Sequence, residues 1–505
     1  MRSILLLSLA FTLDELPADD WPQWRGPRRD GHAPLTARVP VTLSSEPRVV
    51  WRLPIGEGFS SPVVVDGKVF YFDNQAGKET LHAVGAIAHE ELWRVAVDST
   101  FRDEQGPPGP RCTPLVDGDR VYAQSGKGEL QCLRVADGQL VWRANFLKDF
   151  GAAFLGEDSK VPGAAEHGYT AAPVIDDDRL IACVGGTNGA GIVCFDKRTG
   201  KVRWKSQDDL AAYAAPVIAT LAAVKQAVCF TVEGLIGLNP GNGALLWRVP
   251  LKTSYGRHCT TPVIVGDWII SGSFQTGLIG IRISRDGNAI KAEQVWINKA
   301  AAPNFSSPVA VGNYVYGLGP AKNLICVEAA TGKLAWSKEG LFTTAANTAH
   351  ASFLAFGENI LVCTDGGQLI LIAADSTECR ELGRAQVCGL NWCNPAYAEG
   401  RLYVRDGIKA AGSCTASNCC VDHESAATGF VHAWHTQTEA GSFFECESSE
   451  PNKGANSRSV QAPSVVAVVE PAVLGSVRAM PRASSANIST RLRAYSALAP
   501  NPRRA

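Results

Sequence analysis

The sequence predicts an all-β fold, an eight-bladed β-propeller of four-stranded antiparallel blades closed by an N-terminal strand. Three observations favour this fold. One unit recurs along most of the chain, each unit holds short apolar runs between turn signals, and a strand without a unit of its own precedes the first repeat. The chain has 505 residues, of which 46% are hydrophobic and 19% charged, which suits one closed repeat architecture.

Each repeat opens with proline and a β-branched run and closes at tryptophan. The openings are Ser61-Pro62-Val63-Val64, Thr113-Pro114-Leu115-Val116, Ala172-Pro173-Val174-Ile175, Ala215-Pro216-Val217-Ile218, Thr261-Pro262-Val263-Ile264, Ser307-Pro308-Val309-Ala310 and Asn394-Pro395. Between opening and closing, turn pairs such as Asp66-Gly67 and Asp117-Gly118 separate short runs, which predicts four strands per unit and excludes a helical solenoid.

The closing tryptophans set the length of the unit. The distance along the chain between consecutive closing tryptophans ranges from 40 residues (Trp296 to Trp336) to 62 residues (Trp142 to Trp204). A propeller blade has roughly 40 to 50 residues, so the excess is expected in loops. We expect these side chains to be structural; together with the N-terminal one they are Trp51, Trp93, Trp142, Trp204, Trp247, Trp296 and Trp336.

Two irregular segments decide how the ring closes. The unit from Ser352 to Leu382 lacks both the proline and the tryptophan but keeps a hairpin, so it is interpreted as a degenerate blade. Strands at 395–399 and 401–405 begin a last blade, and the segment 48–53 resembles a final strand that can complete it. Such closure removes open sheet edges. The predicted number of blades is then eight, and a seven-bladed ring is the alternative.

The cysteines are expected to be packing residues. Cys132, Cys194 and Cys326 each lie ten residues before a tryptophan, and Ala83 and Gly237 occupy the same position in other units. This position therefore requires a small side chain. The fifteen cysteines show no spacing suited to zinc within the repeats, so neither a metal site nor disulfides are predicted there.

The two ends of the chain differ from the repeats. Residues 1–18 carry one arginine ahead of an apolar run and are interpreted as a signal peptide, with an N-terminal hydrophobic strand or a misannotated start as the alternatives. Residues 19–46 form an N-terminal arm, and 47–407 the propeller. Periodicity stops after Gly407, so the 408–505 tail is expected to be unfolded, either a genuine low-complexity extension or the product of a shifted reading frame.

The expected location and partners of the protein follow from its N-terminal segment, its cysteine positions and its net charge. We expect a periplasmic or secreted monomer without a stable membrane anchor, since no cysteine for lipid attachment precedes Cys112. The formal net charge is −1 and no run of basic residues exists, so nucleic acid is not expected as a partner.

The repeats resemble the pyrroloquinoline-quinone (PQQ) repeat family over residues 47–407. The resemblance lies in closings such as Thr199-Gly200-Lys201-Val202-Arg203-Trp204 and Thr331-Gly332-Lys333-Leu334-Ala335-Trp336. In that family the closing tryptophan packs between neighbouring blades, so the resemblance implies the same packing here. No Trp-Asp dipeptide ends a strand, which distinguishes the repeats from WD40 units. The opening Trp21-Pro22-Gln23-Trp24-Arg25-Gly26-Pro27 is similar to the start of many secreted bacterial members.

The resemblance implies two kinds of function. Some members are quinone-dependent dehydrogenases that hold PQQ and calcium in the funnel, and others are cofactor-free binding scaffolds similar to the assembly lipoprotein BamB. The fold alone does not choose between them. We expect a non-catalytic scaffold without cofactor that binds a protein segment or a polymer, because Glu57 is the only acid near the channel mouth and calcium prefers carboxylates. A PQQ-dependent dehydrogenase is the alternative.

Residues just before each opening proline should crowd one mouth of the central channel. The candidate ligand-binding residues are Phe59, Arg111, Tyr169, Tyr213, His258, Asn304, Phe305, His350, Asn391 and Trp392. Convergent polar and aromatic groups on a rigid scaffold indicate a ligand site. The alternative is that these side chains only fill a narrow channel. No catalytic residue is predicted.

Overall fold

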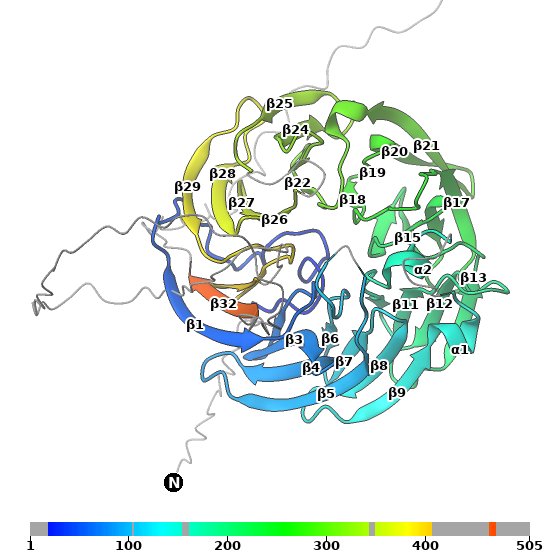
Figure 1. The fold of residues 1–505 in the computed structure, drawn as a ribbon. Coiled ribbons are helices and arrows are strands. Elements are labelled where there is room, and N and C mark those ends of the chain that lie inside the picture. Colours follow the sequence, from blue (N-terminus) through cyan, green and yellow to red (C-terminus); the bar gives the residue numbers. More distant parts are fainter. Residues whose placement is uncertain (1–18, 104–105, 154–160, 343–348, 407–463, 471–505) are drawn as a thin grey trace, which may run out of the picture. The chain divides into compact units, whose positions relative to one another are not determined.

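The computed structural model describes residues 19–103, 106–153, 161–342, 349–406 and 464–470. The predicted signal peptide, residues 1–18, lies outside this range. All described residues belong to the first of two compact units, residues 1–473 and 474–505. The predicted all-β propeller fold is confirmed, because these residues form four-stranded antiparallel sheets that follow one another around a ring (Figure 1).

Eight four-stranded sheets are present in the described residues, each named here by its order along the chain. The first four contain β2 (Val63–Val65), β3 (Lys68–Gln75), β4 (Lys78–Gly85) and β5 (Glu91–Ser99); β6 (Leu115–Asp117), β7 (Arg120–Gln124), β8 (Glu129–Arg134) and β9 (Leu140–Asn145); β10 (Val174–Asp176), β11 (Arg179–Cys183), β12 (Ile192–Asp196) and β13 (Val202–Ser206); and β14 (Val217–Leu221), β15 (Val224–Thr231), β16 (Gly234–Leu238) and β17 (Leu245–Pro250).

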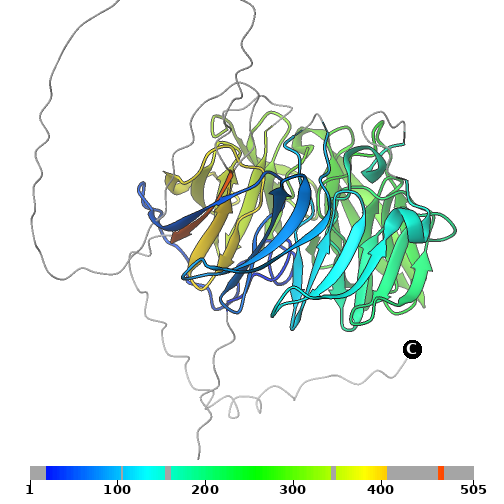
Figure 2. The same ribbon diagram turned by 60° about the horizontal axis from the view of Figure 1, so that its bottom comes forward.

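The remaining sheets continue the ring. They contain β18 (Val263–Val265), β19 (Trp268–Ser273), β20 (Gly277–Asp286) and β21 (Ala289–Asn298); β22 (Val309–Val311), β23 (Tyr314–Leu318), β24 (Leu324–Glu328) and β25 (Leu334–Lys338); β26 (Ala351–Phe356), β27 (Asn359–Thr364), β28 (Gln368–Ala373) and β29 (Glu381–Gln386); and β30 (Ala396–Ala398), β31 (Arg401–Arg405), β32 (Ser464–Glu470) and β1 (Arg48–Ile55). Figure 2 shows neighbouring sheets stacked face against face.

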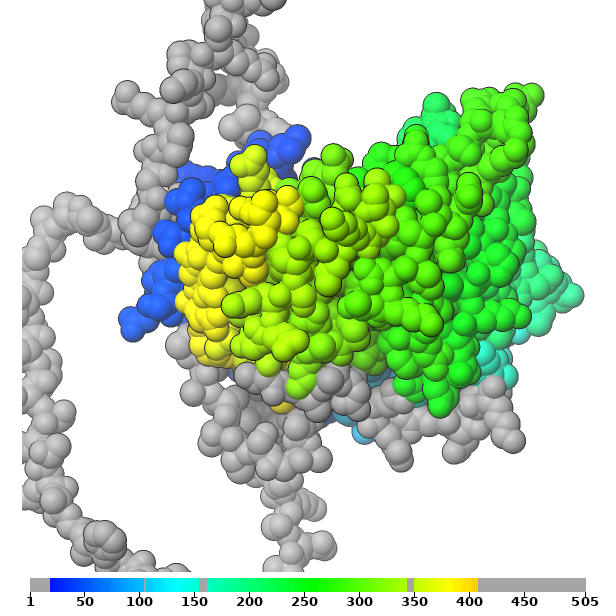
Figure 3. Space-filling view, turned by 90° about the horizontal axis from the view of Figure 1, so that it is seen from above, coloured from blue at the N-terminus to red at the C-terminus, as the bar shows by residue number. Residues whose placement is uncertain are grey.

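Helices are confined to short connections. They are α1 (Phe146–Phe150), α2 (Ala164–His167) and the 3-10 turn η1 (Lys299–Ala301). None of the described helices is long and apolar enough to cross a membrane. In the space-filling view of Figure 3, the fifth, sixth and seventh sheets, coloured green to yellow, form a continuous outer surface.

The closing tryptophans connect each sheet to the next. Their indole N–H donates to a backbone carbonyl just beyond the third strand of the following sheet. The bonds run from Trp51 to Ala86 (2.9 Å), Trp93 to Val135 (2.9 Å), Trp142 to Lys197 (3.0 Å), Trp204 to Pro240 (3.0 Å), Trp296 to Ala329 (3.1 Å) and Trp336 to Asp375 (2.8 Å). The predicted packing of these residues between blades is therefore observed.

Two sequence features leave space for the indole rings. Opposite Trp142 and Trp204 the third strand places Cys132 and Cys194, which are fully buried, and a bulge follows each pair. Gly200 of the third sheet lies against the Trp142 ring at φ +71°, and a Cβ there would be 2.6 Å from that ring. Only glycine satisfies both the backbone angle and the contact.

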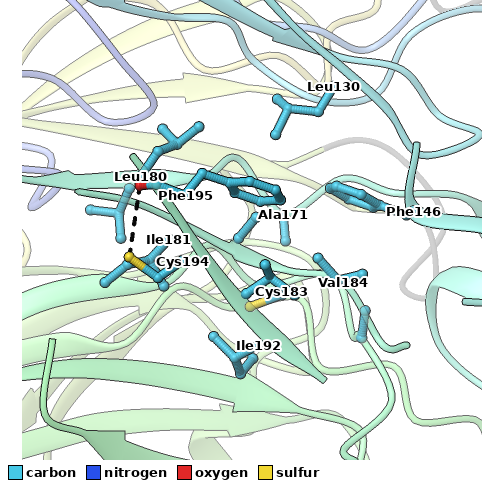
Figure 4. Close-up of a cluster of buried hydrophobic side chains, with 14 of the residues drawn as sticks. Leu130, Phe146, Ala171, Leu180, Ile181, Cys183, Val184, Ile192, Cys194 and Phe195 are labelled. Atoms are coloured by element: carbon cyan, nitrogen blue, oxygen red, sulfur yellow. Dashed lines mark hydrogen bonds between the residues drawn. The ribbon is translucent and has the colours of Figure 1, made fainter. Parts of the chain in front are cut away.

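The cysteines of the repeats are packing residues, as predicted. Figure 4 shows Cys183 and Cys194 among Leu180, Ile181 and Ile192 in the core around the third sheet. Burial raises the pKa of the Cys194 thiol to about 12, so it remains protonated and unreactive at neutral pH. The cysteines of the described residues are all free thiols.

Two sheets depart from the tryptophan pattern. Trp247 donates to Gln226 of its own sheet (2.5 Å). In the next sheet, the residue equivalent to the other carbonyl acceptors is Ile283, and it pairs with Ala292 inside the long β20–β21 hairpin. The degenerate seventh sheet has Gly383 in the tryptophan position, opposite Leu371. Leu43 of the N-terminal arm lies there instead, and a Cβ on Gly383 would be 2.5 Å from its carbonyl oxygen. The arm thus fills the gap left by the missing indole.

The last sheet combines three distant segments. As predicted, β1 forms its outer strand, but the third strand, β32, comes from the segment expected to be unfolded. The prediction for the 408–505 tail is therefore wrong at Ser464–Glu470, and its other residues lie outside the described range. The five apolar residues 465–469 of this strand carry no repeat signal, and only pairing with the edges of β31 and β1 gives the strand its place.

Closure at Trp51 leads to a stability prediction. Trp51→Ala is expected to lower the free energy of unfolding by roughly 3 to 5 kcal/mol, as Trp204→Ala should, because both rings are buried between sheets. Denaturant titration measures the loss. Trp51→Phe keeps an apolar ring but removes the hydrogen bond, so it should cost less. A loss below about 1 kcal/mol for Trp51→Ala would show that this contact does not hold the ring closed.

Pairing of β32 leads to a second prediction. Val468→Pro is expected to destabilise the fold by about 1–3 kcal/mol, since proline removes a backbone donor from a strand paired on both sides. Val468→Thr keeps the N–H and the β-branched shape and serves as the control. Equal unfolding midpoints for the two variants would contradict the pairing of β32 in the last sheet.

Candidate functional site: a closed-ended cavity in the ring

A cavity of about 890 Å³ lies inside the ring, where the connections entering the inner strands converge. Its described lining is contributed by most of the sheets and consists of Trp24, Phe59, Asp103, Arg111, His167, Thr170, Tyr213, Ala215, Arg257, Cys259, Phe274, Ala302, Asn304, Phe305, Leu318, Gly319, Pro320, Ala349, His350 and Trp392. Its size falls within the range of ligand pockets, about 300 to 1,000 Å³.

The N-terminal arm closes one end of this cavity. Residues 21–33 cross the centre of the ring, where the dark-blue trace lies in Figure 1, and Trp24 lines the cavity. Backbone bonds join the arm to the first, second and seventh sheets through Trp21 to Val64 (2.7 Å), Val116 to Pro22 (2.8 Å) and Ala355 to Gly31 (2.8 Å). Side-chain bonds join it to the fifth and sixth sheets through Trp24 to Thr261 (2.9 Å) and His32 to Ala310 (2.7 Å).

Two buried arginines fix the arm in place. Arg29 donates to the carbonyls of Ala172 and Pro173, both at 2.7 Å, and Arg25 donates to the carbonyl of Pro308. Burial lowers the pKa of each guanidinium to about 10, so both remain charged at neutral pH. The floor of the cavity therefore rests on two buried positive charges.

One wall of the cavity is aromatic. Trp392 lies against Phe59 and Phe305, with ring centroids 5.7 and 5.5 Å apart and interplanar angles of 21° and 29°. His350 lies at 6.0 Å from the same indole, and burial lowers its pKa to about 4, which keeps the imidazole neutral. These residues precede the inner strands of the first, sixth, seventh and eighth sheets, so closure of the ring assembles the wall.

The opposite wall is ionic. Arg111 forms a bond of 2.7 Å with Asp103, whose side chain is 1% exposed. His167 Nδ1 lies 3.6 Å from Asp103, and its Nε2 lies 3.1 Å from Glu166. Arg257 extends the chain of charges, with its Nη2 at 3.1 Å from His167. Nearly every formal charge in this wall thus has a partner.

Arg111 lies where the two walls meet. Its guanidinium is 4.7 Å from the Phe59 ring centroid, and its side chain is only 9% exposed. Although Nη2 binds Asp103, the buried Nε has no hydrogen-bond partner. The guanidinium also lies 4.8 Å from the Phe101 ring centroid, so the two aromatic rings and Asp103 hold this positive charge at the edge of the cavity.

Two neutral groups present acceptors to the cavity. Tyr213 donates its hydroxyl to the Gly163 carbonyl (2.6 Å), and Thr170 donates to the Tyr213 carbonyl (2.8 Å). Their oxygens therefore keep only lone pairs for a ligand. Burial raises the pKa of Tyr213 and raises that of Cys259 to about 12, so both side chains are protonated at neutral pH.

The structure brings together most of the predicted mouth residues. Those that line the cavity are Phe59, Arg111, Tyr213, Asn304, Phe305, His350 and Trp392. Tyr169, His258 and Asn391 are buried elsewhere and bind Val184, Thr231 and Cys363, respectively. Each of these three immediately precedes a lining residue, and the side chains of neighbouring residues in extended backbone point in opposite directions.

Polar or aromatic lining residues that the repeat register did not predict include Trp24, Asp103, His167, Arg257 and Phe274. Asp103 corrects the expectation that the mouth offers no acid beyond Glu57. Asp103 and His167 lie in or beside long connections before the inner strands, where the repeat register gives no position, and Trp24 belongs to the arm. Arg257 lies one residue beyond the positions considered.

Comparisons with known proteins agree with the fold. The chain is 23% identical to the outer membrane protein assembly factor BamB of Shewanella oneidensis over 52% of this chain and 65% of that protein. It is 25% identical to BamB of Moranella endobia over 46% of this chain and 58% of that protein. The matches thus span less than two thirds of these relatives.

A solved structure, the quinohemoprotein alcohol dehydrogenase ADHIIG of Pseudomonas putida HK5, is similar with a TM-score of 0.50 and 11% identity, covering 77% of this chain and 76% of that one. This likeness shows the fold alone. A sequence model of the family described as outer membrane protein assembly factor BamB matches residues 41–149 and 104–338, which is more than half of the chain. The protein therefore belongs to the BamB family of PQQ-repeat propellers.

Proposed function

We propose that this protein is a non-catalytic, extracytoplasmic binding scaffold whose cavity receives part of a protein or polymer partner. The family gives the first support, because its described relatives are outer membrane protein assembly factors. Their name suggests both an extracytoplasmic location and a partner that is itself a macromolecule.

The closed-ended cavity carries the proposal. A concave site with a rigid aromatic wall and a rigid polar wall is suited to binding. Its potential nucleophiles are poorly suited to chemistry, since the Cys259 thiol is protonated, and the Tyr213 hydroxyl donates to a carbonyl instead of contacting a base. His350 is buried and neutral, with hydroxyl groups of Ser306 and Ser352 as its hydrogen-bond neighbours.

A quinone cofactor with calcium fits the described residues poorly. Calcium takes six to eight oxygen ligands, usually with several carboxylates. Asp103 is the one carboxylate among the described lining residues, and it already binds Arg111. Across the described part of the chain, no group of three or more His, Cys, Asp or Glu side chains could hold a metal ion. No cofactor is therefore proposed.

The scaffold and dehydrogenase functions differ in a direct assay. Purified protein incubated with PQQ and calcium is expected to show no dye-linked oxidation of alcohols or sugars, because calcium has too few free ligands in the described cavity. A known quinoprotein alcohol dehydrogenase in the same assay is the positive control. Turnover above the rate of free PQQ would overturn the scaffold function.

Binding of PQQ without turnover would have a different meaning. Arg111 and Trp392 are positioned to contact a planar anion, so such binding should disappear in the Arg111→Ala, Trp392→Ala double variant. It would identify the cavity as a ligand site and leave the non-catalytic function in place.

A further inference from the structure

We propose that the cavity binds the end of an acidic polysaccharide, with a uronic-acid unit held between the aromatic wall and Arg111. This inference rests on the proposed binding function and names the class of partner for the same cavity. Four properties of the cavity support it: its closed end, its two unlike walls, its charge, and the direction of its hydrogen bonds.

The closed end determines how a polymer can enter. Residues 21–33 bind the inner strands of several sheets, and Arg25 and Arg29 of this segment are almost completely buried. The arm crosses the centre of the ring and thus lies in the path of a polymer that would pass through it. Only a terminus, or a short oligomer, fits a site of about 890 Å³.

The two walls require a ligand with two unlike faces. Trp392, Phe59 and Phe305 form a broad apolar surface suited to a ring that presents C–H groups or a π-face. The ionic wall lies opposite, and Arg111 contacts both through its position over Phe59. A ring with an apolar face and a charged edge can satisfy both walls at once.

The charge of the lining favours an anion. The described lining residues include two arginines, Arg111 and Arg257, and one carboxylate, Asp103; Glu166 is not among them, although it lies 3.9 Å from Arg257 and 3.1 Å from His167. Arg25 and Arg29 add buried positive charge at the floor. Arg111 lines the cavity, and a guanidinium binds a carboxylate more favourably than it binds a neutral acceptor.

The neutral groups indicate that the ligand also has hydroxyl groups. Tyr213 and Thr170 use their protons on backbone carbonyls, so they can accept but not donate further hydrogen bonds. An aromatic carboxylic acid offers them no donor. A sugar acid offers hydroxyl donors, a carboxylate and an apolar ring face in one unit, and so matches all the features of the lining.

The test compares one trisaccharide with and without its charge. Trigalacturonate is titrated into the full-length protein by calorimetry, with its methyl ester, benzoate and inorganic phosphate as separate ligands. We expect trigalacturonate to bind at least about tenfold more tightly than the ester, because the ester loses the charge-assisted bonds. Quenching of tryptophan fluorescence should accompany binding, since Trp24 and Trp392 line the cavity.

Variants locate the binding. Arg111→Gln should weaken trigalacturonate binding by about tenfold or more and remove the preference over the ester. Arg134→Gln is the matched control, because Arg134 pairs with Asp137 on an exposed turn of the same sheet. If Arg111→Gln fails to fold, Arg257→Gln provides the same comparison from a more exposed position.

Several results would overturn the inference. They are no binding of trigalacturonate at millimolar concentration, equal binding of acid and ester, equal binding of benzoate or phosphate, or an unchanged affinity in the arginine variants. Binding of several protein molecules along one longer chain would contradict recognition of the end. Absence of sugar binding together with absence of PQQ turnover would leave the scaffold function standing, whereas PQQ turnover would overturn that function alone.

Discussion

The hydrogen bond from six of the seven closing indoles to the next sheet is the recurring contact that joins the ring. The apolar side chains of a single four-stranded sheet would be exposed to water, and packing against the neighbouring sheets buries them. The indole adds direction to this packing, because its N–H must meet a carbonyl at a fixed place in the following sheet. Cys132 and Cys194 are small, and Gly200 has a left-handed backbone, because the ring needs that space.

The places where this contact is missing show how the structure compensates. The seventh sheet has no tryptophan, and Leu43 from the arm lies beside Gly383 in its place. In the fourth sheet, Trp247 turns to Gln226 of its own sheet because the following hairpin is extended. The ring therefore tolerates local changes as long as the space between neighbouring sheets is filled and the indole donor has an acceptor.

The cavity is a consequence of closing the ring around the arm. Residues from the first, sixth and eighth sheets form the aromatic stack, and the arm supplies both a lining residue and buried charge. Arg25 and Arg29 are buried at a cost that their carbonyl partners offset, which makes the arm an integral part of the propeller. The same contacts that close the ring around the arm therefore also form the cavity.

The sequence by itself determined the repeat, the blade tryptophans and the closure by β1, because these depend on local periodicity that recurs in register. The same register identified Phe59, Arg111 and Trp392 as neighbours in the cavity, although it could not tell which of two adjacent side chains points inward, as Tyr169 and His258 show. Only the tertiary structure decided that the arm closes the channel, that Asp103 and His167 join the site, and that Ser464–Glu470 forms β32. These segments carry no repeat signal, and their places depend on partners that only the closed ring brings near.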